Sequence, residues 1–307
     1  MTTTSFPSFQ PDELPDGRLV YGTKDSLFEQ NTFGNSAVSS FTSAQSWDPS
    51  YIDIFDVSHG AIGRGTFGAS SIYLFNPSNL STAFTAIAGV TLQNYSLAFR
   101  DSSSLYVGGT NGTAGAHSIS YVKTDGSINK VIIDHAGAFS GGFAVDLAGN
   151  LYVADAEDNK LYRFTPAQIA AAIATAPLDL TNGTLLTTLR RSGSIAVDSL
   201  GRIWSGGYSP VSDGIDVYDP VAGTNINFTP AGANTNYVVT TFSTTGGSYI
   251  GFLNSPTGTS GAALSYGYAL VQTVPEPAGP ALMALGVMIL GGRRTRQRRG
   301  AKSNLEV

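Results

Sequence analysis

The feature that most constrains the fold is a strand–turn–strand pattern that recurs about every 45 residues. Its clearest copy is segment 142–164, where apolar strand 143–145, a turn over 146–150 and strand 151–153 precede a third strand, 161–164. Gly, Asn and Asp at the turns and Val, Leu, Tyr and Phe between them are typical of short antiparallel strands. A meander of this size cannot bury both of its faces alone. We therefore expect similar units to stack beside it.

Five further copies lie along the chain. The equivalent second-strand positions are 43, 43, 46, 52 and 46 residues apart: Leu19, Ile62, Leu105, Leu151, Ile203 and Tyr249. Third strands 72–75, 161–164 and 215–218 each end in aromatic-x-Pro, because proline lacks the N–H that a continuing strand needs. The long interval of 52 contains the Ala-rich segment 166–176, which begins with proline and predicts a short helix between a third and a fourth strand.

Repeats of about 40 to 50 residues with four strands each are typical of a β-propeller. We predict an all-β fold, a six-bladed β-propeller with four-stranded blades, over residues 1–272. The last repeat runs out after its third strand, near 266–272, so that closure of the ring needs a fourth strand from residues 2–9. A stack of repeats that is not closed into a ring is the alternative fold.

The C-terminal region 273–307 has a different character. Val274, Pro275, Glu276 and Pro277 precede the apolar segment 278–292, and an Arg-rich end follows with Arg293, Arg294 and Arg296. The pattern predicts a short transmembrane helix over 278–292, although 15 residues fall short of the roughly 20 that a bilayer core needs. Arginines stay on the cytoplasmic side, so the propeller is expected on the other side.

Charge and cysteine content exclude some functions. Six of the 17 basic residues but only two of the 22 acidic ones lie after residue 272, which leaves the propeller with a net charge of −9. Such a body is a poor partner for nucleic acid, whose binding depends on neutralising phosphates. The absence of cysteine excludes a disulfide scaffold, a thiol nucleophile and Cys-ligated zinc.

Asp146, Asp198 and Asp56 are the candidate metal ligands. They lie in or directly after first strands, where a propeller enzyme can gather carboxylates around a divalent cation such as calcium. The competing interpretation, which we favour, is that each carboxylate caps the backbone of its own turn. The three histidines lie in different repeats without metal spacing, and Trp204 is expected in the core because Tyr152 and Tyr106 occupy its position in sibling strands.

Two resemblances follow from these residues. Segments 142–164 and 194–220 resemble the NHL and gluconolactonase-like propellers, whose repeats read apolar-x-V-D, x-x-G-N-L-Y-V and A-D. Segment 274–299 resembles the PEP-CTERM sorting domain of bacteria, which has a Pro-Glu-Pro box, a short membrane helix and an Arg-rich end in this order. The second resemblance implies an exosortase as partner, transient anchoring in the inner membrane, and delivery to the cell surface or extracellular matrix, often alongside exopolysaccharide.

Two functional hypotheses result. We favour an exported, non-enzymatic propeller without a cofactor that binds exopolysaccharide or a matrix protein. The alternative is a metal-dependent lactonase-like or lyase-like enzyme, with several carboxylates converging on one end of the ring. Residues 1–10 have neither a basic n-region nor an apolar run, so we expect that a secretory signal was removed or begins upstream of Met1.

Overall fold

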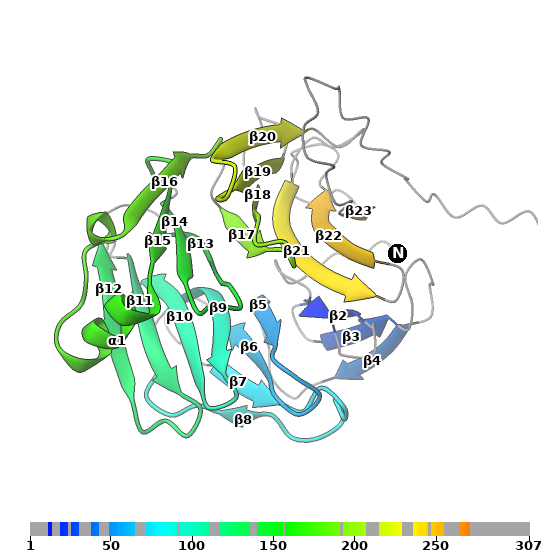
Figure 1. Ribbon diagram of the computed structural model, residues 1–307. Helices are drawn as coiled ribbons and strands as arrows, with labels where there is room; N and C mark the ends of the chain where they lie inside the picture. Colours follow the sequence, from blue (N-terminus) through cyan, green and yellow to red (C-terminus); the bar gives the residue numbers. More distant parts are fainter. Residues whose placement is uncertain are drawn as a thin grey trace, which may run out of the picture.

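The computed structural model describes most of the predicted repeat region. The described residues are 12–13, 19–23, 26–30, 38–42, 49–64, 72–90, 93–110, 117–135, 140–155, 157–190, 193–206, 215–228, 236–244, 247–254 and 265–270. Within them, 23 strands pair into six antiparallel sheets, five of four strands and one of three, which follow one another around a ring (Figure 1). The prediction of an all-β propeller with four-stranded blades is confirmed.

The blades are numbered here in chain order. Blades 1 to 3 consist of β1 Asp12–Glu13, β2 Leu19–Thr23, β3 Ser26–Gln30 and β4 Val38–Thr42; β5 Pro49–Ile54, β6 Gly60–Arg64, β7 Ile72–Phe75 and β8 Thr85–Ala86; and β9 Gln93–Asp101, β10 Ser104–Thr110, β11 His117–Lys123 and β12 Asn129–His135. Blades 4 to 6 consist of β13 Ser140–Val145, β14 Leu151–Asp155, β15 Lys160–Phe164 and β16 Thr184–Thr188; β17 Ser194–Val197, β18 Ile203–Gly206, β19 Ile215–Asp219 and β20 Thr224–Phe228; and β21 Asn236–Thr244, β22 Gly247–Asn254 and β23 Ser265–Leu270.

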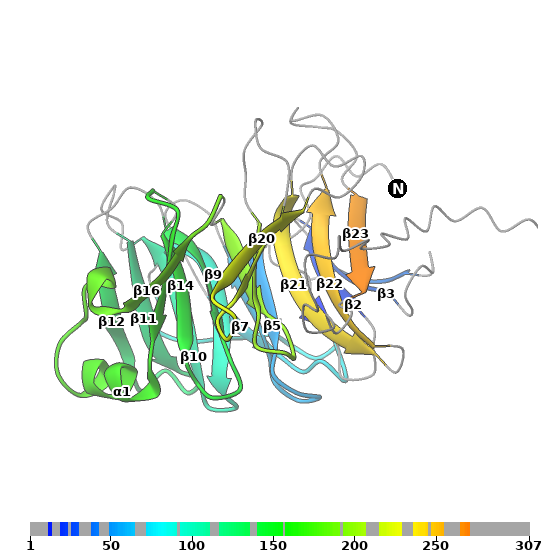
Figure 2. The same cartoon turned by 45° about the horizontal axis from the view of Figure 1, so that its top comes forward.

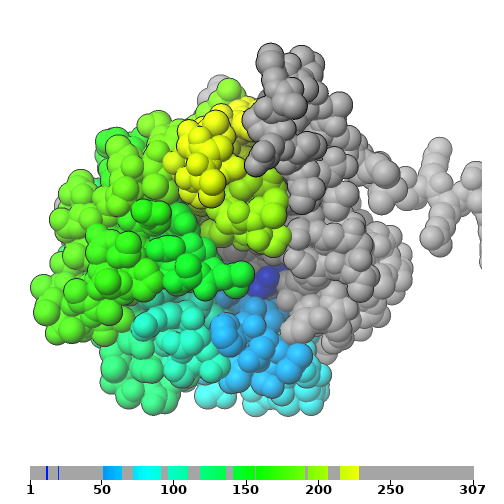
Figure 3. All heavy atoms as spheres, in the orientation of Figure 1, coloured from blue at the N-terminus to red at the C-terminus, as the bar shows by residue number. Residues whose placement is uncertain are grey.

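The first strand of each blade lies innermost, and the first strands of successive blades lie side by side (Figures 1 and 2). The turns that join first to second strands and third to fourth strands therefore share one end of the ring, which we call the hairpin face. The opposite end, where second strands turn into third strands, is called the loop face. In the space-filling view blades 2 to 5 follow the chain order around the ring (Figure 3).

The core lies between blades rather than inside a single layer. All five residues of β14 are buried. Leu151 and Val153 pack against blade 3, whereas Tyr152 and Ala154 pack in a second cluster with Ile195 and the rest of blade 5. Because alternate side chains of a strand point to opposite faces, a blade between two neighbours needs apolar residues at every position. This explains the near-continuous apolar run that marks the repeat in the sequence.

All six predicted second-strand positions lie in second strands, but the alignment of blade 2 was wrong by two residues. Ile62 lies opposite Ile52 and Tyr73, whereas Gly60 lies opposite Phe75 as Leu151 lies opposite Phe164. The Phe75 ring fills the place of the missing side chain, because a Cβ at Gly60 would lie 2.5 Å from Phe75 Cζ. A pattern of apolar residues could not identify a glycine as the equivalent of a leucine.

The predicted helix between third and fourth strands is confirmed as α1, Pro166–Ala174. Thr165 and Gln168 form a capping box at its start, and Lys130 of β12 donates to the carbonyl oxygens of Ile173 and Thr175 at its end (2.6 and 3.0 Å). The chain then pairs at Leu178 with Ile133 of β12, before the short 3-10 helix η1, Leu180–Asn182. The insertion thus ties blade 4 to the outermost strand of blade 3.

Two aspartates connect innermost strands of neighbouring blades. Asp12 of β1 and Asp53 of β5 accept the backbone N–H groups of Ile54 and Phe99, respectively, each at 2.5 Å. Burial raises the pKa of Asp53 to about 6, and the bond from Phe99 N–H opposes the shift only in part. The folded chain therefore holds the proton of this carboxyl group more tightly than the unfolded chain does.

This shift makes the stability depend on pH. Because the pKa of Asp53 is higher in the folded chain than its ordinary value of 3.8, its contribution to stability is full below about pH 4 and is lost as the pH rises through about 6. Asp53→Asn removes that titration, so that its stability relative to the unchanged chain should rise by about 1–3 kcal/mol between pH 4 and pH 7, measured by urea unfolding. Asp125→Asn is the control, and its stability relative to the unchanged chain should change with pH in the opposite direction. The reason is that hydrogen bonds from Ser127 hold the pKa of Asp125 below its usual range. An equal pH dependence of both variants would contradict the assignment.

Candidate functional site

Asp146, the first candidate metal ligand, follows β13 and closes the turn to β14. Its carboxylate accepts the backbone N–H and the side-chain amide of Asn150, both at 2.8 Å, and the Tyr152 hydroxyl at 3.0 Å. These donors lie four and six residues further along the chain. The carboxylate thus holds together the turn and the start of the second strand.

Asp198 repeats this arrangement in blade 5. Its carboxylate accepts the N–H groups of Leu200 and Arg202, the Arg202 Nε–H at 2.8 Å and the Trp204 Nε1–H at 2.8 Å. The side-chain donors again lie four and six residues ahead, and the side chains of Asp198, Arg202 and Trp204 are all buried. The expected core position of Trp204 is confirmed. The recurring D-x-x-G-x-x-aromatic pattern is thus a structural clip in which the carboxylate, half-buried in Asp146 and buried in Asp198, orients a buried aromatic side chain.

Asp56 also binds within its own turn. It accepts the N–H groups of Ser58 and His59 and contacts His59 Nδ1 at 2.8 Å. The three candidates lie on three different hairpins, and among the described residues no three side chains of His, Cys, Asp or Glu are grouped so that they could hold a metal ion. The structure therefore places these aspartates as caps of their own turns, and their donor set does not fit a shared calcium site.

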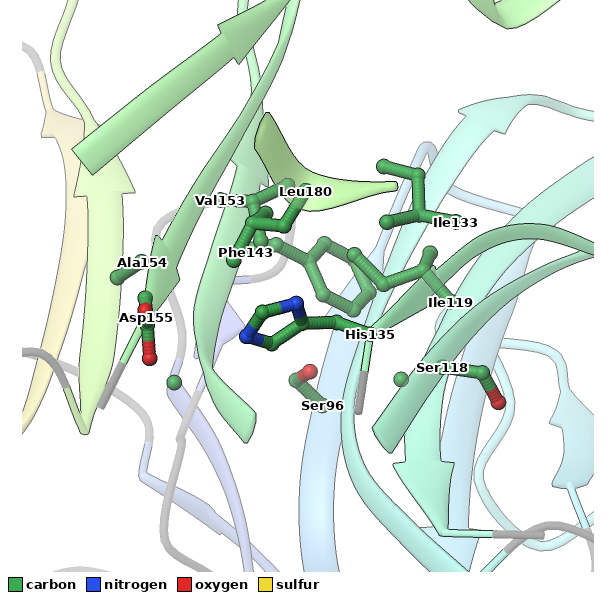
Figure 4. Close-up of a pocket in the computed structure, with 12 residues that line it drawn as sticks. Ser96, Ser118, Ile119, Ile133, His135, Phe143, Val153, Ala154, Asp155 and Leu180 are labelled. Atoms are coloured by element: carbon green, nitrogen blue, oxygen red, sulfur yellow. The ribbon is translucent and has the colours of Figure 1, made fainter. Parts of the chain in front are cut away.

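A small pocket between blades 3 and 4 brings together residues that the sequence did not single out. It has a volume of about 30 Å³, which is room for about two water molecules. Blade 3 contributes Ser118 and His135 to its lining, and blade 4 contributes Phe143 and Asp155 (Figure 4). The rest of the lining is mainly apolar. The polar residues lie where their strands approach the loop face.

The polar groups of this pocket leave hydrogen-bonding capacity for a small ligand. Ser118 is 4% exposed, and its buried Oγ has no partner among the described residues. His135 Nδ1 lies 3.7 Å from Asp179 Oδ2, which is too long for a hydrogen bond. The Thr181 hydroxyl and N–H hold the pKa of Asp179 below its usual range, so this carboxylate is charged at neutral pH. The arrangement suits a hydroxyl or a water molecule.

Sequence reasoning missed this pocket. His135 and Ser118 come from β12 and β11, and the fourth strands are the least regular part of the repeat. The prediction that the three histidines lie in different repeats was wrong, because His117 and His135 both lie in blade 3, where β11 and β12 place them opposite each other.

The predicted sorting signal lies outside the described residues, as do residues 2–9. This applies to the tetrapeptide, to apolar segment 278–292 and to the arginines: Val274, Pro275, Glu276, Pro277, Arg293, Arg294 and Arg296. Among the residues that the structure describes, no helix has the length and apolar character needed to cross a bilayer.

Comparisons with known proteins identify the fold of this chain but not its activity. No family model matches the chain, and no curated protein is significantly similar to it. Among solved structures, a protein named as a gluconolactonase has a TM-score of 0.60 at 14% identity, over 85% of this chain and 88% of that one. The nidogen/laminin complex reaches 0.60 at 12% identity, over 75% and 83%. Regucalcin from Agrobacterium tumefaciens strain C58, a calcium-binding protein, reaches 0.56 at 14%, over 82% and 84%.

Similarity at this level shows a shared fold alone. It supports the β-propeller fold of the body, which the protein named as a gluconolactonase shares. Both enzymes and binding proteins have this architecture, so the comparisons favour neither kind of function.

Proposed function

We propose that this chain is an exported six-bladed propeller that is anchored through its C-terminal region, sorted by an exosortase, and used at the cell surface or in the extracellular matrix as a binding module. The six sheets are the six blades, and residues 2–9 supply the missing fourth strand of blade 6. The order of tetrapeptide, apolar segment and arginines in 274–299 supports the sorting.

One observation carries the non-enzymatic part of the proposal. The carboxylates that a propeller hydrolase would direct at a metal, Asp146 and Asp198 above all, accept hydrogen bonds from their own hairpins. A carboxylate that orients a buried aromatic side chain has a structural role. The binding surface is then the loop face, where the pocket with His135 and Ser118 offers polar groups to an exopolysaccharide hydroxyl or to a matrix protein.

The metal-dependent lactonase or lyase remains the second candidate. Its specific support is that the fold is shared with a protein named as a gluconolactonase and with calcium-binding regucalcin. It would use a divalent cation such as calcium, with ligands other than the turn aspartates.

The experiment that tests the proposal determines, in the native host, at which residue the mature protein ends and in which cell fraction it is found. The full gene with its upstream in-frame codons is expressed, cells are fractionated, and the intact mass of the product is determined. We expect loss of everything after the region 274–277 and a product outside the inner membrane. The control, Pro275→Ala with Pro277→Ala, alters the tetrapeptide but leaves the apolar segment and arginines intact, and should accumulate uncleaved in the membrane.

An unprocessed product in the cytoplasm would overturn the proposal. In that case the enzyme becomes the better interpretation, and a screen of lactones with and without calcium becomes the relevant assay.

A further inference from the structure

Exposed apolar side chains are concentrated on the hairpin face. Within the described part of the chain, eight large apolar side chains are exposed, and six of them lie in turns at this end of the ring. Leu147 and Val221 are almost completely exposed, at 103% and 93%. The six come from blades 2 to 5: Phe55, Val57, Ile128, Leu147, Leu200 and Val221. Exposed apolar side chains that gather at one end of a fold are candidates for an interaction surface.

These side chains, which we call the apolar tips, are held by short turns with fixed backbones. Asp219 accepts the N–H of Val221 at 2.8 Å, and Asp198 accepts the N–H of Leu200 at 2.9 Å. Leu147 lies in the turn that Asp146 closes. A tip fixed in this way loses little conformational freedom when it enters an apolar environment.

The chain leaves the described fold on this same face. Strand β23 is antiparallel to β22, with Leu270 opposite Tyr249, close to the turn between β21 and β22. The last described residue, Leu270, therefore lies at the hairpin face, and the arrow of β23 in Figure 2 points the same way as the hairpins of the other blades. Seven residues, 271–277, separate it from apolar segment 278–292. Seven residues reach at most about 25 Å.

We propose that the hairpin face lies on the lipid bilayer that holds the C-terminal apolar segment, with the apolar tips in the interfacial layer. This inference rests on the proposed function, which places segment 278–292 in the membrane. Residues 271–277 connect the ring to the membrane segment and so keep the apolar tips at a high local concentration near the bilayer. The binding free energies of individually weak insertions then add up. The loop face and its pocket then point away from the membrane for as long as the C-terminal region is uncleaved.

The charge of the face selects the kind of lipid. Its turns contain Asp56, Asp125 and Asp219, and hydrogen bonds from Ser58 and Ser127 hold the pKa of Asp56 and Asp125 below the usual range. The carboxylates of Asp56 and Asp125 are therefore charged at neutral pH, and they oppose an anionic surface. We therefore expect a preference for zwitterionic phosphatidylcholine or phosphatidylethanolamine.

The experiment uses the full chain, whose lack of cysteine allows one fluorophore to be placed at a time. Val57→Cys, Leu147→Cys and Leu200→Cys label three tips. Glu157→Cys labels the loop face, and Leu285→Cys labels the apolar segment. Each labelled chain is reconstituted into phosphatidylcholine vesicles, with and without brominated acyl chains that quench nearby fluorophores.

The tip labels should lose more than about half of their fluorescence in brominated vesicles, since interfacial side chains reach about 5–10 Å into the boundary layer. The Glu157 label should be unaffected. Leu147→Asp with Leu200→Asp should abolish quenching at the Val57 label. The matched control, Leu185→Asp with Ile226→Asp, changes two exposed apolar side chains on outer strands and should leave that quenching unchanged.

The outcomes separate this inference from the proposed function. Quenching at Leu285 but not at the tips would overturn the inference and leave the membrane segment in place. No quenching at Leu285 would contradict the proposed anchoring itself. A blue shift of the tip labels without vesicles would mean that the tail or a second copy of the chain covers the face, which also overturns the inference.

Discussion

Asp198→Ala is expected to lower the free energy of unfolding by about 3–5 kcal/mol, because it leaves a buried charge without its partner. The Arg202 side chain is 10% exposed and pairs with Asp198 at 2.8 Å, while the buried Trp204 indole donates to the same carboxylate oxygen. The replacement leaves the buried Arg202 and Trp204 donors without this acceptor. It also removes the hydrogen bonds from the backbone N–H groups of Leu200 and Arg202 that stabilise the turn. Urea unfolding followed by Trp fluorescence measures the loss.

Asp219→Ala is the matched control. Asp219 is the last residue of β19 and accepts two backbone N–H groups, those of Val221 and Ala222, but among the described residues it pairs with no buried cation. We expect it to cost about 1 kcal/mol. In the double variant Asp198→Ala with Arg202→Met the unpaired charge is gone, so much of the lost stability should return. Equal costs for Asp198→Ala and Asp219→Ala would refute the structural clip and restore Asp198 as a candidate ligand.

Gly142→Ala is expected to cost up to about 3 kcal/mol, through a collision between blades rather than a loss of contacts. A Cβ at position 142 would lie 2.6 Å from Ser194 Cα and from Ile195 N, both backbone atoms of β17 in the next blade. Backbone atoms cannot rotate out of the way as a side chain can. Blades 4 and 5 would have to separate along their innermost strands, which thermal unfolding would detect as a lower Tm.

Gly201→Ala distinguishes this mechanism from ordinary glycine strain. Gly201 has a φ of +77°, and nothing lies within 4 Å of the Cβ position, so only the left-handed backbone opposes the substitution, at about 1–2 kcal/mol. A Gly142→Ala variant no less stable than Gly201→Ala would contradict the close approach of β13 and β17.

The sequence determined the architecture of the body because a repeated meander can bury its apolar residues only against copies of itself. The second strands, the third strands that end before proline, and helix α1 could all be predicted, since each depends on local chemistry that is visible within a few residues. The register of blade 2 could not, because Gly60 fulfils its role through the ring of Phe75 on the neighbouring strand.

Only the tertiary structure decided what the aspartates and histidines do. In the sequence, an Asp after a strand looks identical whether it binds calcium or caps a turn. The two roles are distinguished by the hydrogen-bond donors around the carboxylates, which are Asn150 and Tyr152 for Asp146 and Arg202 and Trp204 for Asp198. The pocket at His135 and the gathering of apolar tips on one face likewise depend on residues from different blades. The repeat therefore specified the ring, because burial is encoded locally, whereas the surfaces on which a function can act arise from juxtaposed blades and became visible only in the folded chain.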